Sequence, residues 1–175
     1  MSRLDELGVD SICPDLPGCN ESLIPHSAQS LAAWRIAAIA AANHFSATHV
    51  LAFRSGCWIV PSALPGWLYA PSKPGQVLRA MLRARTIAAR EAGRQETAES
   101  LLEQGRKEGL ELAGWKLGSA LIGELEATGF EVHDHHNTID HSEIGGKALW
   151  LRAENDFDPE QAEALAALIA AGISS

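Results

Sequence analysis

Apolar residues along the chain form two kinds of pattern, long stretches typical of helices and short continuous runs typical of buried strands. Residues 30–45 are apolar almost all round, and Ser30 stands where a helix N-cap is expected. Residues 48–53 form a continuous β-prone run, which predicts a central parallel strand covered on both faces. Further short strands are predicted at residues 67–70 and 148–153. These elements indicate a short, mainly parallel sheet.

Several helical segments follow one another between the second and third of these strands. The pattern predicts helices over residues 77–92, 96–104 and 119–129, with a short extended segment over residues 110–115. Because the alternation of strand and helix is interrupted here, we expect residues 73–128 to form a helical cap inserted at the edge of the sheet.

A last helix is predicted over residues 158–172, with Asp158 as its N-cap and Pro159 at its first position. No internal repeat or low-complexity linker divides the 175 residues, which fit one domain. The expected fold is therefore a single α/β domain over residues 1–175. It has three layers, with helices on both faces of the sheet and the helical cap insertion.

Composition excludes several classes of protein. The formal net charge of −8 at pH 7 argues against a nucleic-acid-binding protein. Three cysteines without paired spacing do not indicate a disulfide framework. The sequence contains neither a signal peptide nor a run of 18 apolar residues. We therefore expect a cytoplasmic protein, with no nucleic-acid partner and no resident metal or cofactor.

The first candidate site lies where the run of residues 48–53 ends. A nucleophile elbow reads small-x-nucleophile-x-small, because its sharp turn tolerates no bulk on either side. Ala52 and Gly56 are small, but Arg54 stands at the nucleophile position. Arginine stays protonated and cannot attack a carbonyl, and Ser55 comes one residue too late. A plain strand end, a degenerate elbow and an active Ser55 are the three open interpretations.

Acidic and histidine residues are candidates in the last third of the chain. Glu154 and Asp156 follow the last predicted strand, where catalytic acids often lie in α/β folds. Residues 133–141 contain side chains that are good metal ligands, but in no established spacing. These are His133, Asp134, His135, His136, Asp140 and His141. The stretch is either a solvated polar loop or a metal or anion site.

Basic residues gather in and just before the predicted helix over residues 77–92, against the acidic balance of the whole chain. They are Lys73, Arg79, Arg83, Arg85 and Arg90. Arg79 and Arg83 lie one helical turn apart, so Arg79, Arg83 and Arg85 are candidates for binding a phosphate or an anionic membrane surface. The alternative is a solvated helix face whose arginines pair with acidic residues elsewhere.

Several ordered segments resemble the α/β-hydrolase superfamily. Residues 9–22 resemble the strand and turn that often read D-x-x-G-x-G-x-S there, and residues 48–56 resemble the elbow strand. More narrowly, "LAFRSG", "PGQVLRAMLRARTIAAREAG" and "GLELAGWKLGSALIGELEATG" are similar to the hydrolase-like proteins associated with exosortase A gene clusters. The resemblance covers about residues 5–171 and implies that residues 73–128 form the cap. In that group the molecular activity is assigned by fold only.

Departures from the superfamily pattern weigh against a working catalytic triad. On the resemblance, a strand and oxyanion-hole loop would precede Val9, and a strand and the catalytic histidine would follow residue 171. This sequence has neither, and its nucleophile position is Arg54. The histidines of residues 133–141 do not fit the order of nucleophile, acid and histidine.

The expected function is therefore that of a degenerate α/β-hydrolase-fold protein with a non-catalytic role in binding or assembly. The resemblance links that role to exopolysaccharide export. Two alternatives are open: a hydrolase acting on an ester or thioester, and a metal-binding protein that uses residues 133–141. Expected partners are a second copy of the chain, because exposed edge strands invite pairing, and an acidic partner or membrane surface at the basic helix.

Overall fold

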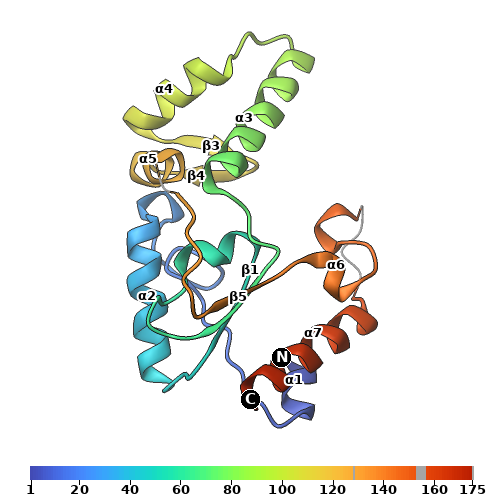
Figure 1. The fold of residues 1–175 in the computed structure, drawn as a ribbon. Coiled ribbons are helices and arrows are strands. Elements are labelled where there is room, and N and C mark those ends of the chain that lie inside the picture. Colours follow the sequence, from blue (N-terminus) through green and yellow to red (C-terminus); the bar gives the residue numbers. More distant parts are fainter. Residues whose placement is uncertain (128, 153–156, 175) are drawn as a thin grey trace.

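The computed structural model describes residues 1–127, 129–152 and 157–174, and it has a mixed α/β architecture (Figure 1). The strands are β1 (Val50–Phe53), β2 (Gly66–Tyr69), β3 (Leu110–Leu112), β4 (Trp115–Leu117) and β5 (His136–Ile139). The α-helices are α1 (Ser2–Glu6), α2 (Leu31–His44), α3 (Pro74–Glu91), α4 (Ala98–Glu108), α5 (Ser119–Ala127), α6 (His141–Ile144) and α7 (Pro159–Ile173). Three 3-10 helices, η1 (His26–Ala28), η2 (Arg54–Ile59) and η3 (Leu149–Leu151), complete the described elements.

A small parallel sheet in the order β1-β2-β5 lies at the centre of the fold, as expected for an α/β protein. The prediction that residues 48–53 form a central strand is wrong, because β1 lies at an edge. The central strand is β2, whose four residues are all buried. A continuous apolar run indicates burial, but it does not say which strand has a neighbour on both sides.

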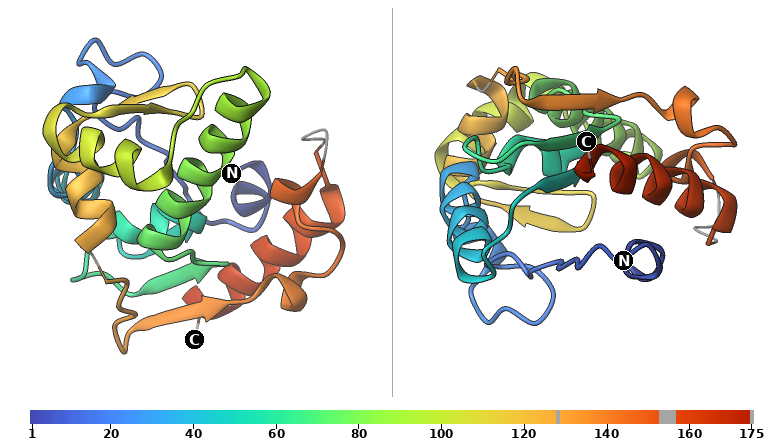
Figure 2. Two further views of the ribbon diagram at one scale, coloured as in Figure 1. Left: turned by 90° about the horizontal axis from the view of Figure 1, so that it is seen from above. Right: turned by 60° about the horizontal axis from the view of Figure 1, so that its bottom comes forward.

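The two faces of β2 pack against different parts of the chain. Trp67 and Tyr69 join Ile139 and Ile169 in one apolar cluster, so α7 covers this face. Leu68 points to the other face and packs with Cys57 of η2. This packing on both faces explains why every residue of the strand is buried. Helices α2 and α7 lie on opposite sides of the sheet in both views of Figure 2.

Residues 73–127 form a mainly helical segment, the insertion, which lies at the top of Figure 1 and shares its buried core with Leu31 of α2. Leu82 of α3, Leu101 of α4 and Leu121 of α5 are buried together there. The predicted extended segment over residues 110–115 is instead a hairpin of β3 and β4. The chain reverses at Ala113 and Gly114, whose φ angles of 51° and 82° suit a two-residue hairpin turn.

Three predicted features differ from the structure. Residues 148–153 were expected to form a strand, but Leu149–Leu151 is a 3-10 helix, and the third strand of the sheet is β5. Only two residues of this edge strand, His136 and Ile139, are buried, so it lacks a continuous apolar run. Residues 9–13, part of the segment that resembles a strand and turn of the α/β-hydrolases, are irregular. Helix α2 is apolar almost all round, as a buried helix would be, but it exposes Ile36 and Ile39.

Two of the predicted helix starts, at Ser30 and Asp158, are confirmed by their capping contacts. The side chain of Ser30 accepts a hydrogen bond from the backbone N–H of Ala33 at 3.0 Å, which begins α2. Asp158 caps α7 in the same way, accepting from the backbone N–H of Gln161 at 3.1 Å. Across the described residues, none of these helices combines the length and apolar character that crossing a membrane would need.

Candidate functional site

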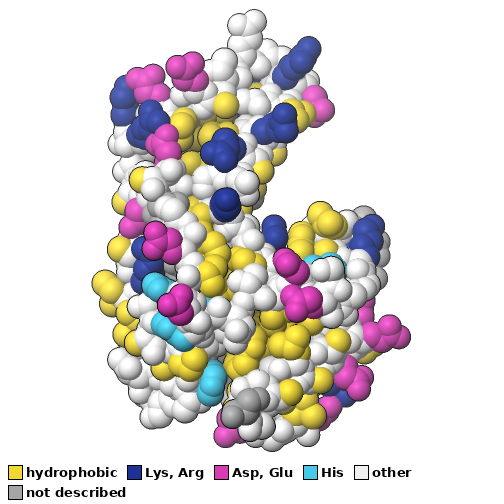
Figure 3. Space-filling model, viewed as in Figure 1, with side chains coloured by type: hydrophobic (Ala, Val, Ile, Leu, Met, Phe, Trp, Pro, Cys, Tyr) yellow, Lys and Arg dark blue, Asp and Glu magenta, His cyan; other side chains and the backbone are white. Residues whose placement is uncertain are grey.

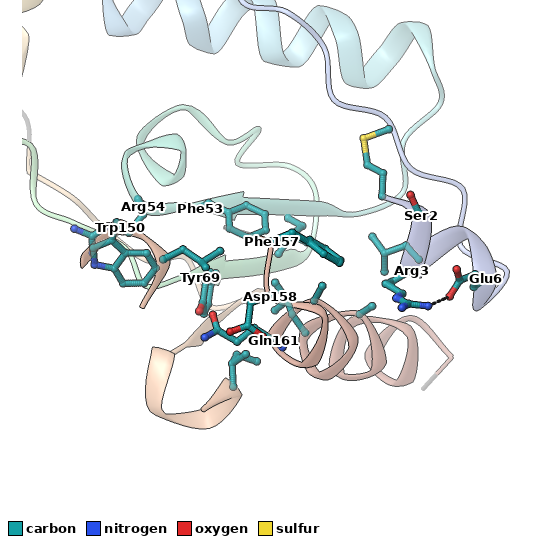
Figure 4. A pocket seen from close by; sticks show the side chains of 18 residues that line it. Ser2, Arg3, Glu6, Phe53, Arg54, Tyr69, Trp150, Phe157, Asp158 and Gln161 are labelled. Atoms are coloured by element: carbon teal, nitrogen blue, oxygen red, sulfur yellow. Dashed lines mark hydrogen bonds and ion pairs between the residues drawn. The ribbon is translucent and has the colours of Figure 1, made fainter. Parts of the chain in front are cut away.

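A cavity of about 780 Å³ lies beside the carboxyl ends of β1 and β2 and is bounded by α1 and α7 (Figure 4). Most of its lining is apolar, including Leu51, Phe53, Tyr69, Trp150, Phe157 and Leu165. The carboxyl end of a parallel sheet is where ligands usually bind in open α/β folds, and the volume suits a small molecule. The cavity is therefore the candidate functional site.

Arg54 reaches this cavity from the turn that follows β1. Its φ of 51° lies in the left-handed region, so β1 passes into η2 through a sharp turn. The guanidinium Nη1 donates a hydrogen bond to the backbone oxygen of Ala70 at 3.1 Å. Its Cζ lies 4.6 Å from the centre of the Trp150 ring, a cation–π contact. These two contacts hold the guanidinium at the cavity wall, next to Trp150 in Figure 4.

The charged side chains that line the cavity are balanced except for Arg54. Arg3 forms an ion pair with Glu6 at 2.6 Å, shown as a dashed line in Figure 4. Asp158 is paired with Arg152 at 2.5 Å. No described Asp or Glu forms an ion pair with Arg54. Among the charged side chains of the described lining, the guanidinium of Arg54 is therefore the one without an ion-pair partner, which favours an anionic group nearby.

A tyrosine and a histidine form a second polar feature at the same edge of the sheet. The Tyr69 hydroxyl lies 2.5 Å from Nδ1 of His141, whose Nε2 lies 3.1 Å from the backbone oxygen of Gly146. A carbonyl can only accept, so Nε2 carries the ring proton and Nδ1 accepts from the tyrosine. Burial raises the pKa of Tyr69, which keeps this hydroxyl protonated. The hydrogen bond fixes the orientation of the Tyr69 side chain in the cavity wall. Neither residue of the pair is a serine or cysteine nucleophile.

The predicted catalytic residues are not brought together by the structure. Ser55 is exposed on η2, does not line the cavity and has no hydrogen bond to a described histidine. A serine without a base beside it is a weak nucleophile. Glu154 and Asp156 lie outside the described residues. Of the four catalytic candidates, the structure places Arg54 in the cavity.

The predicted anion-binding arginines lie on α3, away from the cavity. None of the described residues that line the cavity belongs to the insertion. Arg79 and Arg83 are exposed and form no ion pair with a described residue. Arg85 differs, because its guanidinium pairs with Glu96 at 2.9 Å and donates to the backbone oxygen of Glu111 at 2.7 Å. Arg85 is therefore already engaged within the insertion.

Three histidines of the polar stretch cluster on the amino-terminal side of β5. The ring centres of His133, His135 and His136 lie 4.6–5.7 Å apart. Nε2 of His135 lies 2.7 Å from the backbone oxygen of Ser62, and Nε2 of His136 lies 2.9 Å from that of Leu64. These two nitrogens therefore carry protons and are not free to bind a metal.

The rest of the stretch does not complete a metal site. His141 belongs to the pair with Tyr69, and Asp140 caps α6. Among the residues that the structure describes, no group of three or more His, Cys, Asp or Glu side chains is arranged to hold a metal ion. The geometry thus gives no support to metal binding through residues 133–141.

Three residues in or beside the cavity were missed by reasoning from the sequence. Tyr69 and His141 are 72 positions apart and meet only because β2 and β5 are neighbours. Tyr69 lies near the carboxyl end of the strand predicted over residues 67–70, and this place in the strand could have indicated it as a site residue. His141 was grouped with the wrong histidines, and Trp150 was assigned to a strand that does not form.

Comparison with known proteins leaves the function to be inferred from the site. The chain matches no protein-family model, no curated protein sequence and no solved structure. An α/β architecture hosts many unrelated functions. What the residues of the cavity can bind, and which reactive groups they lack, must therefore indicate the function.

Proposed function

We propose that the chain is a degenerate α/β-hydrolase-like protein that binds a small molecule in its cavity without hydrolysing it. The observation that carries this proposal is the guanidinium of Arg54, held at the cavity wall in the place of a nucleophile. The turn after β1 supports the hydrolase-like part of the proposal, because a left-handed residue between a strand and a helix also carries the nucleophile in an elbow. A role in exopolysaccharide export rests on the sequence resemblance alone.

Hydrolysis of an ester needs an activated nucleophile and donors that stabilise the oxyanion. Arg54 donates hydrogen bonds but cannot form an acyl intermediate. His141, whose ring centre lies 5.3 Å from that of Trp150, accepts from Tyr69 and has no hydrogen bond to a described serine or cysteine. Binding without turnover is therefore the function that the described residues support best.

Turnover of para-nitrophenyl butyrate tests the proposal against the hydrolase alternative. We expect the purified wild type and Ser55→Ala to release para-nitrophenol at the same rate, equal to the rate in buffer. Ser62→Ala is the matched control, since this serine is also exposed and outside the cavity. A rate lost in Ser55→Ala but kept in Ser62→Ala, with a fluorophosphonate label on Ser55, would overturn the proposal.

A second proposal concerns the basic face of α3 and an anionic membrane surface. Arg79, Arg83 and Arg90 are four and seven positions apart, so they share one side of the helix. All three are exposed without an ion pair to a described residue, and Ile87 beside them is 54% exposed. Figure 3 shows basic side chains spread over this part of the surface. Basic and apolar groups on one helix face favour an anionic lipid surface.

Flotation with lipid vesicles tests this second proposal. We expect binding to vesicles that contain anionic lipid at low salt, and weaker binding at high salt, because salt screens exposed charges. Arg79→Gln/Arg83→Gln should lose the binding. Arg94→Gln/Lys107→Gln, which removes two charges elsewhere on the insertion, should keep it. Equal flotation of both double variants would contradict the proposal and leave an acidic protein as the alternative partner.

A further inference from the structure

We infer that the cavity binds an amphipathic carboxylate, with its head at Arg54 and its hydrocarbon tail between β1, α1 and α7. The inference rests on the proposed binding function and names the ligand class. Three features of the cavity carry it: a guanidinium without an ion-pair partner, a lining that is mostly apolar, and large apolar side chains left uncovered.

The head of the ligand is assigned from the charges around the cavity. Arg54 is the one charged side chain of the described lining without an ion-pair partner, which favours an anionic head group beside it. Its hydrogen bond to Ala70 uses one of five guanidinium N–H groups. The ring of Trp150 lies against the guanidinium, so the edge that carries the other N–H groups stays available. A planar guanidinium edge suits a carboxylate, which it can bind through two parallel hydrogen bonds.

The tail is assigned from the residues beyond Arg54. Phe53 is 48% exposed and Phe157 is 74% exposed, although both line the cavity. Figure 4 shows them between Arg54 and α1, with the Arg3–Glu6 pair on the far side. Leu4 of α1 and Leu165 of α7 also belong to the apolar part of the lining. A hydrocarbon chain placed here would cover the two phenylalanines and remove their surface from water.

Titration calorimetry with ligands of one chain length tests the head and the tail separately. We expect dodecanoate to bind the wild type and dodecyltrimethylammonium to show no binding. Arg54→Gln should weaken dodecanoate binding roughly 10- to 100-fold, as for loss of a hydrogen-bonded charge. Arg54→Lys should restore part of the loss, and Arg94→Gln, outside the cavity, should bind like the wild type. Shortening the acid to decanoate should weaken binding roughly tenfold.

A change in the fold of Arg54→Gln is detected independently by its far-ultraviolet circular dichroism and its binding of dodecan-1-ol. The alcohol lacks a charge, so we expect equal affinity for the wild type and for Arg54→Gln. Equal binding of dodecanoate by both proteins would overturn the inference, as would tighter binding of dodecyl phosphate than of dodecanoate. If dodecanoate and dodecan-1-ol both fail to bind, the proposed binding function falls as well. Hydrolysis that depends on Ser55 would overturn the proposed function and leave the ligand assignment standing.

Discussion

Arg54 combines a strained backbone with a side chain held from two sides. A φ of 51° costs free energy in any residue other than glycine, so the surrounding structure must maintain it. The contacts with Ala70 and Trp150 provide part of that support. A positively charged side chain kept in this conformation at a cavity wall is consistent with an anchor for an anion, and its chemistry is incompatible with nucleophilic attack.

At the residue scale, His136 makes stability depend on pH. The ring is 5% exposed, and its Nδ1 is buried without a hydrogen-bond partner. Burial lowers its pKa below 6.5, and the neighbouring His135 and His133 add to this effect. The unfolded chain therefore takes up a proton at a higher pH than the folded chain does. The contribution of His136 to stability is complete above pH 6.5 and is lost as the pH falls below it.

We test this by urea unfolding of the wild type and His136→Gln at pH 7.5 and pH 5.5. The free energy of unfolding should fall more in the wild type than in the variant on acidification. His44→Gln, which changes an exposed histidine at the end of α2, should behave like the wild type. An equal fall in the wild type and His136→Gln would show that this ring does not cause the dependence.

The fold requires a glycine at position 66. A Cβ at this position would lie 2.0 Å from the backbone oxygen of Val50, its partner in the neighbouring strand. Gly66→Ala should therefore force β1 and β2 apart and lower the free energy of unfolding by about 1–3 kcal/mol. Gly56→Ala is the matched control, because no atom lies within 4 Å of its added Cβ. Urea unfolding compares the two, and equal stability would contradict the close approach.

At the scale of elements, α2 is tied to the insertion through its first turn. The carboxylate of Glu124 on α5 accepts hydrogen bonds from the backbone N–H groups of Leu31 at 2.5 Å and Ala32 at 3.3 Å. Free N–H groups at a helix start bind a negative charge well. Glu124→Ala should lower the free energy of unfolding by about 1 kcal/mol. Glu131→Ala, at an exposed loop position, should have no such effect in the same urea titration.

Sequence patterns predicted the helices better than the strands, for a physical reason. Helix starts depend on local contacts, as at Ser30 and Asp158, and these contacts can be recognised within a few residues. Strand β5 depends on its neighbour β2, and only His136 and Ile139 need to be buried. The more apolar Leu149–Leu151 is exposed, which periodicity alone could not indicate.

The residues of the candidate site differ in the same respect, because some could be predicted from local sequence and others depend on tertiary contacts. Arg54 was found because a nucleophile elbow is a contiguous motif. The hydrogen bond between Tyr69 and His141 depends on two strands that meet across 72 positions, and no short motif describes it. Whether Arg54 has an ion-pair partner also depends on long-range packing, because the tertiary fold determines which Asp and Glu side chains lie near it.

At the scale of the whole molecule, the insertion and the cavity belong to different regions. The buried cluster of α3, α4 and α5 contains Leu82, Leu101 and Leu121, whereas the cavity lies between the sheet, α1 and α7. The insertion therefore does not cover the candidate site in the described structure. Ligand binding at Arg54 and surface binding at α3 should be separable by mutation, because Arg54 lines the cavity whereas Arg79 and Arg83 of α3 do not.

Exposed apolar side chains and the edges of the sheet are relevant to self-association of the chain. Ile36 is 69% exposed and Ile39 is 46% exposed on α2, and β1 and β5 are the edges of the sheet. Pairing with a second copy would cover such a surface, and self-association stays a prediction of the sequence. Light scattering in solution measures it directly as a mass of one chain or of two.

The central claim is that a ligand carboxylate lies against Arg54 in a cavity without catalysis. Nuclear magnetic resonance of dodecanoate labelled with ¹³C at the carboxyl carbon measures the pKa of the bound acid. An adjacent guanidinium lowers this pKa, whereas burial in an apolar cavity without a cation raises it. We predict a value below that in water for the wild type and a higher value in Arg54→Gln. A raised pKa in the wild type that Arg54→Gln leaves unchanged would contradict the account.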